Sequence, residues 1–303
     1  MGKLPTMRSD KSEILPYNFK NYFVFIGTER LSDHPNRCMF NHWHDDLEIV
    51  IPIQGNMVYN INGDLIRLEP GKGVFVNSNQ IHYGFSSDDS DCVFIYALWH
   101  PMLLCATNEI ESEYVNPIVK NSSIPYLKLN DQCDWQRSIM ADVQSMHGQL
   151  SERAAPLMLQ SYIYDIWHTI FVNTTQERKR SASASPQLSI LKDMLSYIHD
   201  GYHEKMTLNE IADSGNISIS NCNVIFKKYL KESPIKYLLN YRLMKSTELL
   251  ISSAMPITEV AFEVGFSNPS YYIDAFRKAY GNTPNDYRKK HRKADVFEEY
   301  TDN

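Results

Sequence analysis

The 303-residue sequence lacks several features that would assign its class at once. Its five cysteines are scattered and none forms a CxxC pair, which favours reduced thiols in a cytoplasmic protein over a disulfide framework. No stretch is apolar over the ~18 residues that a membrane-spanning helix needs. The first residues lack the apolar segment of a secretory signal. We therefore expect a cytoplasmic protein with no membrane partner.

A basic excess is also missing from the chain as a whole, which carries a formal net charge of −6. The charge is uneven, however. Residues 1–174 hold 12 Lys and Arg against 20 Asp and Glu, whereas residues 188–293 hold 15 against 11. An acidic front and a modestly basic rear indicate that the rear part is the one that meets phosphate.

Two domains with a linker between them fit the length and the composition. Residues 175–187 are polar, repetitive and free of large apolar side chains, which is typical of a flexible linker. This divides the chain into a front domain over 1–174, a rear domain over 188–293 and a tail over 294–303.

The rear domain contains one pattern twice, 50 residues apart. The repeated pairs are Phe226 and Phe276, Pro234 and Pro284, and Tyr237 and Tyr287. A unit of two short helices joined by a turn with Gly is typical of a helix-turn-helix, and a pair of such units indicates a DNA-binding protein. We expect an all-α domain with double-stranded DNA as its partner.

The first unit carries clear helix-start signals. Thr207 and Glu210 form a capping box, and Ser218 precedes the second helix of the unit. The sequence predicts one long helix over residues 234–251 between the units, which would space the two reading helices by about one DNA turn.

The second unit follows the same plan. Gly265 turns the chain, and Ser267 or Asn268 caps its reading helix. Asn pairs bidentately with adenine and Arg with guanine, each giving roughly 1–3 kcal/mol of discrimination. Helical spacing predicts that the outward, DNA-contacting positions of the two reading helices are Ser220, Asn221, Asn223, Val224, Lys227, Asn268, Ser270, Tyr271, Asp274 and Arg277.

Residues 188–293 resemble the AraC family of bacterial transcription regulators. The resemblance is carried by Ile211-Ala212, Phe226-Lys-Lys, Ser233-Pro234, Gly265-Phe266-Ser267, Phe276-Arg-Lys and Gly281-Asn-Thr-Pro284. It implies that both units bind one face of the DNA in successive major grooves. Lys231 stands where the family usually has Gly, which would cost roughly 1 kcal/mol if the backbone is left-handed there. Asp274 replaces a residue that is basic in many members.

The front domain begins with short segments rich in β-branched and aromatic residues, separated by turns. Asn62-Gly63 is a strong tight-hairpin signal, and the whole predicts a small barrel or double-sheet roll. From about residue 131 apolar residues recur every three or four positions, which predicts a helical hairpin to residue 173. Its apolar stripe belongs either to the core or to a dimer interface. The expected fold class is α+β multidomain.

His42, His44, Glu48 and Gly55 match the cupin pattern HxHx3Ex6G, and His82 follows from its looser second part. The resemblance implies a barrel with a pocket over about 17–105, and AraC-type regulators often carry such a barrel in front. In one interpretation the pocket binds an organic effector, a sugar being one candidate. Its predicted ligand-binding residues are His42, His44, Glu48, His82, Trp43 and Tyr96.

In the other interpretation His42, His44, Glu48 and His82 bind a divalent metal, since three imidazoles and a carboxylate suit Zn, Fe, Mn or Ni. No cofactor follows with certainty. The favoured function is a cytoplasmic, dimeric, sequence-specific transcription regulator without enzymatic activity, with RNA polymerase as an additional candidate partner. The alternatives are a metal-dependent cupin enzyme fused to a DNA-binding domain and a ligand-independent regulator.

Overall fold

The computed structural model describes the backbone of residues 6–7, 13–174 and 186–298 and the side chains of 15–174 and 186–291. The chain divides into two compact units, Met1–Pro186 and Gln187–Asn303. Residues 175–185 of the predicted linker lie outside the described residues. Within the described chain, no helix combines the length and the apolarity needed to cross a membrane.

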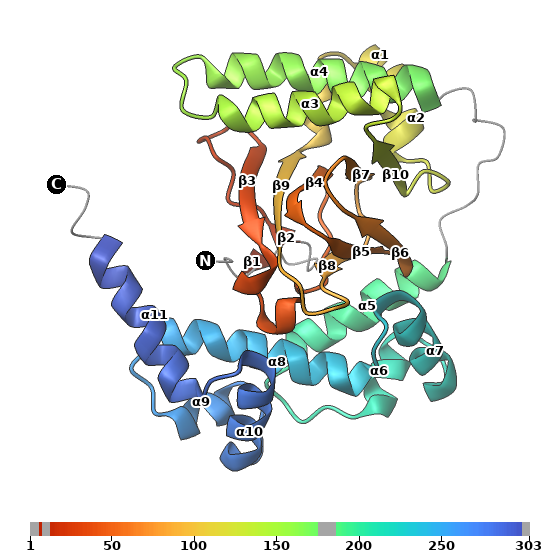
Figure 1. Ribbon diagram of the computed structural model, residues 1–303. Coiled ribbons are helices and arrows are strands. Elements are labelled where there is room, and N and C mark those ends of the chain that lie inside the picture. Colours follow the sequence, from red (N-terminus) through yellow and green to blue (C-terminus); the bar gives the residue numbers. More distant parts are fainter. Residues whose placement is uncertain (1–5, 8–12, 175–185, 299–303) are drawn as a thin grey trace. The chain divides into compact units, whose positions relative to one another are not determined.

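The first unit is built on two antiparallel sheets (Figure 1). A five-stranded sheet has the order β10-β7-β4-β9-β3, a three-stranded sheet has the order β6-β5-β8, and β1 pairs with β2. The strands are β1 (Thr6–Met7), β2 (Glu13–Ile14), β3 (Val24–Arg30), β4 (Leu47–Gly55), β5 (Met57–Ile61), β6 (Asp64–Leu68), β7 (Lys72–Val76), β8 (His82–Phe85), β9 (Cys92–Trp99) and β10 (Tyr126–Asn130).

Side-chain alternation along β4 separates two cores. Leu47, Ile49 and Ile51 are buried in the cluster that includes residues of the helices, whereas Val50 is buried with residues of the three-stranded sheet. Successive side chains on a strand point to opposite faces. Glu48 therefore lies on the same face as Val50, toward the interior between the two sheets.

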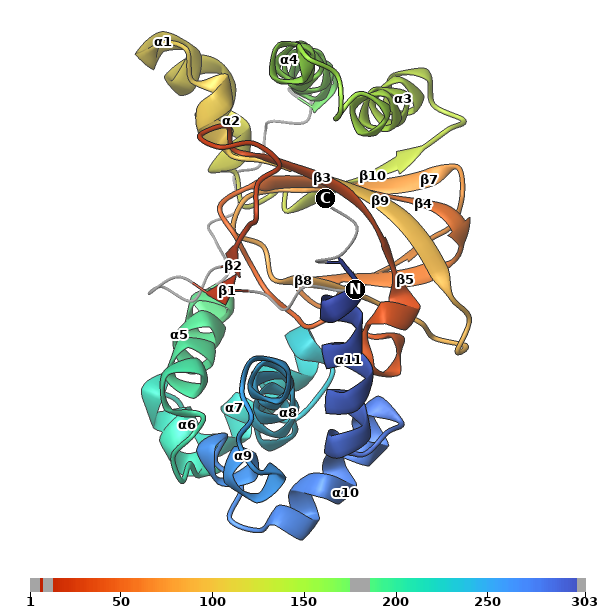
Figure 2. The same cartoon turned by 90° about the vertical axis from the view of Figure 1, so that its left-hand side faces the viewer.

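Helices cover the outer face of the five-stranded sheet. Figure 2 shows α3 (Asp134–Gly148) and α4 (Ala155–Thr174) side by side over that sheet, with the three-stranded sheet on its other side. This is the hairpin that the periodicity predicts. The short helical turns are η1 (Leu31–Asp33), η2 (Pro35–Arg37), η3 (Pro101–Leu104), α1 (Asn108–Ile110), η4 (Glu111–Val115) and α2 (Asn116–Val119).

The expected end of the barrel near residue 105 is wrong. Strand β10 lies beyond α2 in sequence, yet it pairs with β7 along the edge of the five-stranded sheet. Its position depends on a partner about 50 residues earlier, which local sequence patterns do not encode. Asn77 helps to hold this edge, since its amide nitrogen donates to the carbonyls of Ile118 and Ile124 at 2.9 Å.

The second unit is all-helical, with α8 (Pro234–Ser252) running between two sets of helices (Figure 1). The remaining helices are α5 (Pro186–Gly201), α6 (Leu208–Ser214), α7 (Ile219–Leu230), α9 (Ile257–Glu263), α10 (Pro269–Tyr280) and α11 (Pro284–Glu298). The fold class is thus the expected one. The predicted tail is still helical up to Glu298, because nothing in its charged sequence breaks a helix.

Two arginines fasten loops of this unit through backbone carbonyls. Arg242 on α8 donates to the carbonyls of Tyr202 and Glu204, both at 2.7 Å. Arg288 on α11 donates to the carbonyls of Leu250 and Met255 at 3.2 and 2.6 Å. Both guanidinium groups therefore stabilise the packing of the unit.

Candidate metal centre and nucleic-acid interface

Three histidines and one glutamate meet inside the front unit. His42 and His44 lie just before β4, Glu48 is on β4, and His82 begins β8. The backbones of His42 and His82 are joined by two hydrogen bonds of 3.2 and 3.0 Å, which brings the two histidine segments together. All four residues are buried, with exposed fractions of 8, 1, 4 and 1 % respectively.

The three imidazoles are held in the same way. Their Nδ1 atoms lie 2.9, 3.0 and 2.8 Å from the carbonyl oxygens of Phe40, Asp46 and Gln80, for His42, His44 and His82 respectively. A carbonyl only accepts, so each Nδ1 is a donor, and Nε2 is the ring nitrogen that is left to face the centre. This fixing of the outer ring nitrogen is typical of histidines that bind metal ions.

The ligand-type atoms of the four side chains converge. One nitrogen from each histidine lies within 4.8 Å of the other two. The Glu48 Oε2 atom lies 2.8 Å from His82 Nε2 and 3.7 Å from His44 Nε2. The Tyr59 hydroxyl donates to the other carboxylate oxygen of Glu48, Oε1, at 3.2 Å. The three histidine nitrogens are thus clustered, and the Oε2 atom of Glu48 lies beside those of His44 and His82.

The ionisation states suit a cation at this point. Burial, together with the neighbouring His82 and His44, lowers the pKa of His42 to about 3, so its ring is neutral at pH 7. Burial by itself would raise the pKa of Glu48. The effects of His82 and His44 outweigh it and hold that pKa well below its ordinary value. Neutral imidazoles and a carboxylate form the donor set that Zn²⁺ and related ions use, so the residues fit a metal.

The two aromatic residues proposed as effector contacts are in different environments. Trp43 is 3 % exposed. Tyr96 is half-buried and packs against the cluster of Val50, Tyr59 and Phe94 in the interior between the sheets. Tyr59 is not among the predicted ligand-binding residues. Its hydroxyl contacts Glu48 and makes it part of the centre. The sequence alone does not show this contact, because it depends on how β5 is placed in the folded sheets.

The helix-turn-helix units have the expected local structure. Thr207 and Glu210 form the capping box of α6, and Ser218 caps α7 by accepting from the amide of Asn221. Gly265 has a φ of 89° in the second turn. Lys231 adopts a φ of 61°, so the strain expected for a non-glycine residue at this position applies.

The positions predicted to contact DNA lie mainly at the surface. All of them are exposed except Asn223, which is half-buried and donates to the carbonyl of Ile219 at 3.0 Å. On α10, Arg277 and Asp274 form an ion pair of 3.1 Å.

Asn268 is the residue that caps α10, and Ser267 is not. Its side-chain oxygen accepts from the amides of Ser270 and Tyr271. A bidentate contact with adenine requires both the oxygen and the nitrogen of the amide. We therefore no longer expect Asn268 to make that contact.

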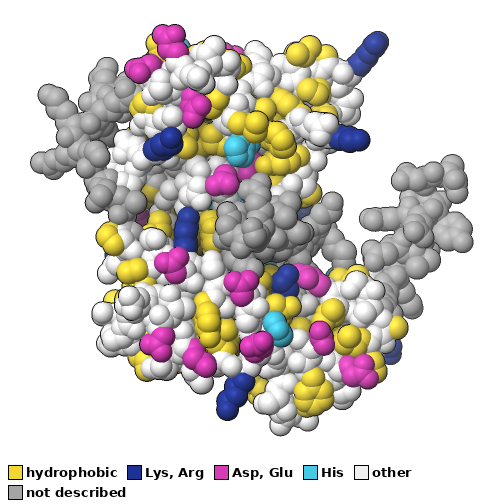
Figure 3. Space-filling model, turned by 180° about the vertical axis from the view of Figure 1, so that it is seen from behind, with side chains coloured by type: hydrophobic (Ala, Val, Ile, Leu, Met, Phe, Trp, Pro, Cys, Tyr) yellow, Lys and Arg dark blue, Asp and Glu magenta, His cyan; other side chains and the backbone are white. Residues whose placement is uncertain are grey.

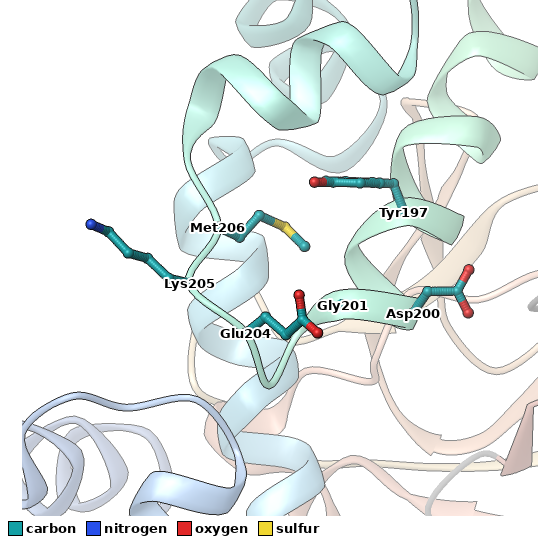
Figure 4. A pocket seen from close by; sticks show the side chains of 6 residues that line it. All are labelled: Tyr197, Asp200, Gly201, Glu204, Lys205 and Met206. Atoms are coloured by element: carbon teal, nitrogen blue, oxygen red, sulfur yellow. The ribbon is translucent and has the colours of Figure 1, made fainter.

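Two views of the surface of the described residues concern charge and shape outside this centre. On the face that Figure 3 shows, acidic side chains are scattered and basic ones do not gather in one patch. A small hollow at the end of α5 is lined by Tyr197, Asp200, Gly201, Glu204, Lys205 and Met206 (Figure 4). In Figure 4 the Lys205 side chain points away from the other five residues. The mixed charges of this hollow offer no convergent set of ligands.

A sheet unit with a buried polar centre and a helical unit with two helix-turn-helix motifs define a ligand-regulated DNA-binding protein. Family models match in the same order: an AraC-like ligand binding domain over residues 25–166 and a helix-turn-helix domain over residues 211–290. The chain is 32 % identical over 250 residues to the uncharacterized HTH-type transcriptional regulator YdeC of Bacillus subtilis (strain 168), covering 82 % of this chain and 85 % of YdeC. It belongs to the AraC family of transcription regulators.

Two further relatives are also transcription regulators by name. The melibiose operon regulatory protein of Escherichia coli (strain K12) is 24 % identical over 261 residues, covering 84 % of this chain and 85 % of that protein. The HTH-type transcriptional activator RhaS of Shigella sonnei (strain Ss046) is 22 % identical over 256 residues, covering 82 % and 87 %. DNA is thus a partner of the rear unit, and the front unit is a ligand-binding domain.

Proposed function

We propose that the chain is a cytoplasmic, homodimeric regulator that reads an operator with α7 and α10 and changes its DNA binding when a small molecule occupies the front unit. The observation that carries this proposal is the pair of capped helices on either side of α8, each with exposed polar side chains near its N-terminal half. The N-terminal part of such a helix is the part that reaches base edges in the major groove. The relatives support regulation over catalysis.

The two helices offer different chemistry to DNA. On α7 the exposed residues include Asn221 and Lys227, suited to an adenine edge and a phosphate. On α10 the exposed Asp274 and Arg277 form an ion pair with each other. We propose that Asp274 positions the Arg277 guanidinium for a guanine, or accepts from a cytosine beside it. RNA polymerase is a further proposed partner once the protein is on DNA.

The exposed side of α4 supports a homodimer. Leu157 is 78 % exposed, and Tyr164 and Val172 follow it at intervals of seven and eight residues on the same helix. Residues at this spacing lie along one helical face. The apolar residues that face inward, such as Ile163 and Ile170, are already buried against the sheet. We propose that a second copy of the chain covers the outer face.

A sugar is the effector class that we propose for the front unit, because relatives are named for a sugar operon. An effector shifts DNA binding only when it has different affinities for two states of the protein. A dimer whose DNA-binding units are joined to the front units through residues 175–187 could provide two such states. The test is a change in operator affinity when sugars are added one at a time.

The base contacts are tested on an operator selected from random double-stranded DNA by the wild-type protein. Arg277→Ala should weaken binding to it by roughly 5–150-fold and relax the preference at one base pair. Lys227→Ala should weaken binding uniformly and reduce the salt slope by about 1. Arg153→Ala, which removes an exposed cation from the front unit, is the charge-matched control. Unchanged affinity in both variants would contradict the groove assignment.

A further inference from the structure

The centre formed by His42, His44, His82 and Glu48 is incomplete as a network of hydrogen bonds. Among the described residues, the Nε2 atoms of His44 and His82 and the Oε2 atom of Glu48 are buried without a hydrogen-bond partner. The Glu48 and His82 atoms approach to 2.8 Å, which is within the distance of an ion pair. Buried polar atoms that are left unpaired destabilise a fold, so the arrangement points to a missing cationic partner.

The surroundings prepare these atoms for one cation. The carbonyls of Phe40, Asp46 and Gln80 hold the outer ring nitrogens, which turns the inner nitrogens toward the centre. Tyr59 donates to Glu48 Oε1 and so leaves Oε2 directed toward the histidines. A side-chain arrangement of this kind is the outer support that fixes metal ligands in proteins.

We propose that His42, His44, His82 and Glu48 bind one divalent transition-metal ion as an enclosed centre that links the two sheets of the front unit. Glu48 belongs to the five-stranded sheet, and His82 belongs to the three-stranded sheet. Four protein donors, each at most 8 % exposed, are the number that a closed, non-catalytic site supplies. Three nitrogen ligands select ions such as Zn²⁺, Mn²⁺, Fe²⁺ or Ni²⁺ over Mg²⁺ and Ca²⁺, which take oxygen ligands.

This proposal goes beyond the proposed function and is independent of it, since a metal can link the sheets whether or not the chain reads the operator described above. The ion acts on the stability of the front unit. A ligand that binds the folded state alone raises its unfolding temperature in proportion to the logarithm of its concentration. The prediction is therefore a metal-dependent melting transition of the full-length protein.

The test uses full-length protein without a histidine tag, stripped with a chelator and then titrated with Zn²⁺ or Co²⁺. The expected results are one ion per chain by elemental analysis, visible d–d absorption for Co²⁺, and a rise in the melting temperature. Mg²⁺ should produce no rise. Glu48→Gln, which keeps the size and the contact with Tyr59, should lose at least tenfold in metal affinity, and His44→Ala should lose stoichiometric binding.

His147→Ala is the matched control, because His147 is a histidine of α3 whose ring bonds to Thr28 outside the centre. It should retain one ion per chain and the same Co²⁺ spectrum as the wild type. The proposal is overturned if the stripped wild type binds no ion, or if Glu48→Gln and the wild type bind equally. A Glu48→Gln variant that changes the melting temperature while metal has no effect on the wild type would identify a buried Glu48–His82 ion pair instead.

Discussion

The two helix-turn-helix units differ in the cap of their first helix and in the residue that takes the left-handed conformation after their second helix. Thr207 and Glu210 cap α6, but no described side chain caps α9, whose N-cap is Pro256. Reading helix α7 ends at Lys231, with a φ of 61°, and α10 ends at Gly281, with a φ of 72°. The same motif is thus stabilised by different residues in its two copies. Substitutions at equivalent positions should therefore change the free energy of unfolding by different amounts.

The largest difference concerns the turn glycines, Gly265 and Gly215. A Cβ atom on Gly265, where φ is 89°, would lie 2.6 Å from the backbone oxygen of Tyr202. On Gly215 it would lie 2.8 Å from the flexible side chain of Met194. We expect Gly265→Ala to destabilise the rear unit by about 3–5 kcal/mol and Gly215→Ala by about 1–2 kcal/mol. Thermal unfolding measures both, and equal effects would contradict the comparison.

The next difference is the residue after the left-handed position, Glu232 in the first unit and Asn282 in the second. Burial raises the pKa of Glu232 to about 7, although Lys236 and Asn240 oppose this. The folded pKa exceeds the unfolded one, so folding is favoured most below about pH 4.5 and loses stability as the pH rises through 7. Glu232→Gln should therefore stabilise the unit by on the order of 2 kcal/mol at pH 8. Melting curves should show no gain near pH 4.5.

Loss of the capping box is the third expected effect. Thr207→Ala removes the acceptor for the Glu210 amide and should destabilise the unit by about 1 kcal/mol. Thr258→Ala changes an exposed threonine in the first turn of α9, which has no side-chain cap, and should alter stability by less than about 0.5 kcal/mol. Urea denaturation of the two variants compares them, and an equal loss would show that the box contributes nothing.

The smallest effect concerns the ends of the reading helices. Lys231→Gly removes a left-handed strain of about 1–2 kcal/mol but makes the unfolded chain more flexible, so the net gain should be about 0.5–1 kcal/mol. The hydrogen bond from Lys231 Nζ to the Lys228 carbonyl is lost as well. Gly281→Ala should destabilise by a similar amount. Melting temperatures that move in the same direction for both variants would refute the assignment of strain.

Short-range signals explain why so much of the rear unit could be predicted. Caps such as Thr207 and Ser218 depend on residues three positions away, and the repeat itself exposes the two units. The barrel strands with strong β-propensity were also predictable. Strand β10 was not, because its pairing with β7 is a long-range contact.

The candidate centre shows the same limit. The spacing of His42, His44 and Glu48 is visible in the sequence, whereas the support from Tyr59 depends on two strands being brought together. Asn268 shows a different limit. Its position predicts a contact with DNA, but its side-chain oxygen already accepts hydrogen bonds from the backbone amides of Ser270 and Tyr271.

The loop after α5 has a consequence for the evolution of the operator. The carbonyl groups of Tyr202 and Glu204 in this loop accept hydrogen bonds from Arg242 of α8. The Tyr202 carbonyl also lies against Gly265, in the turn of the second helix-turn-helix. The two helix-turn-helix units are thereby joined through one loop and one helix. We expect single base substitutions within either half-site of the operator to be tolerated during evolution. Insertion or deletion of a base pair between the half-sites should be excluded, because it would rotate one reader away from its groove.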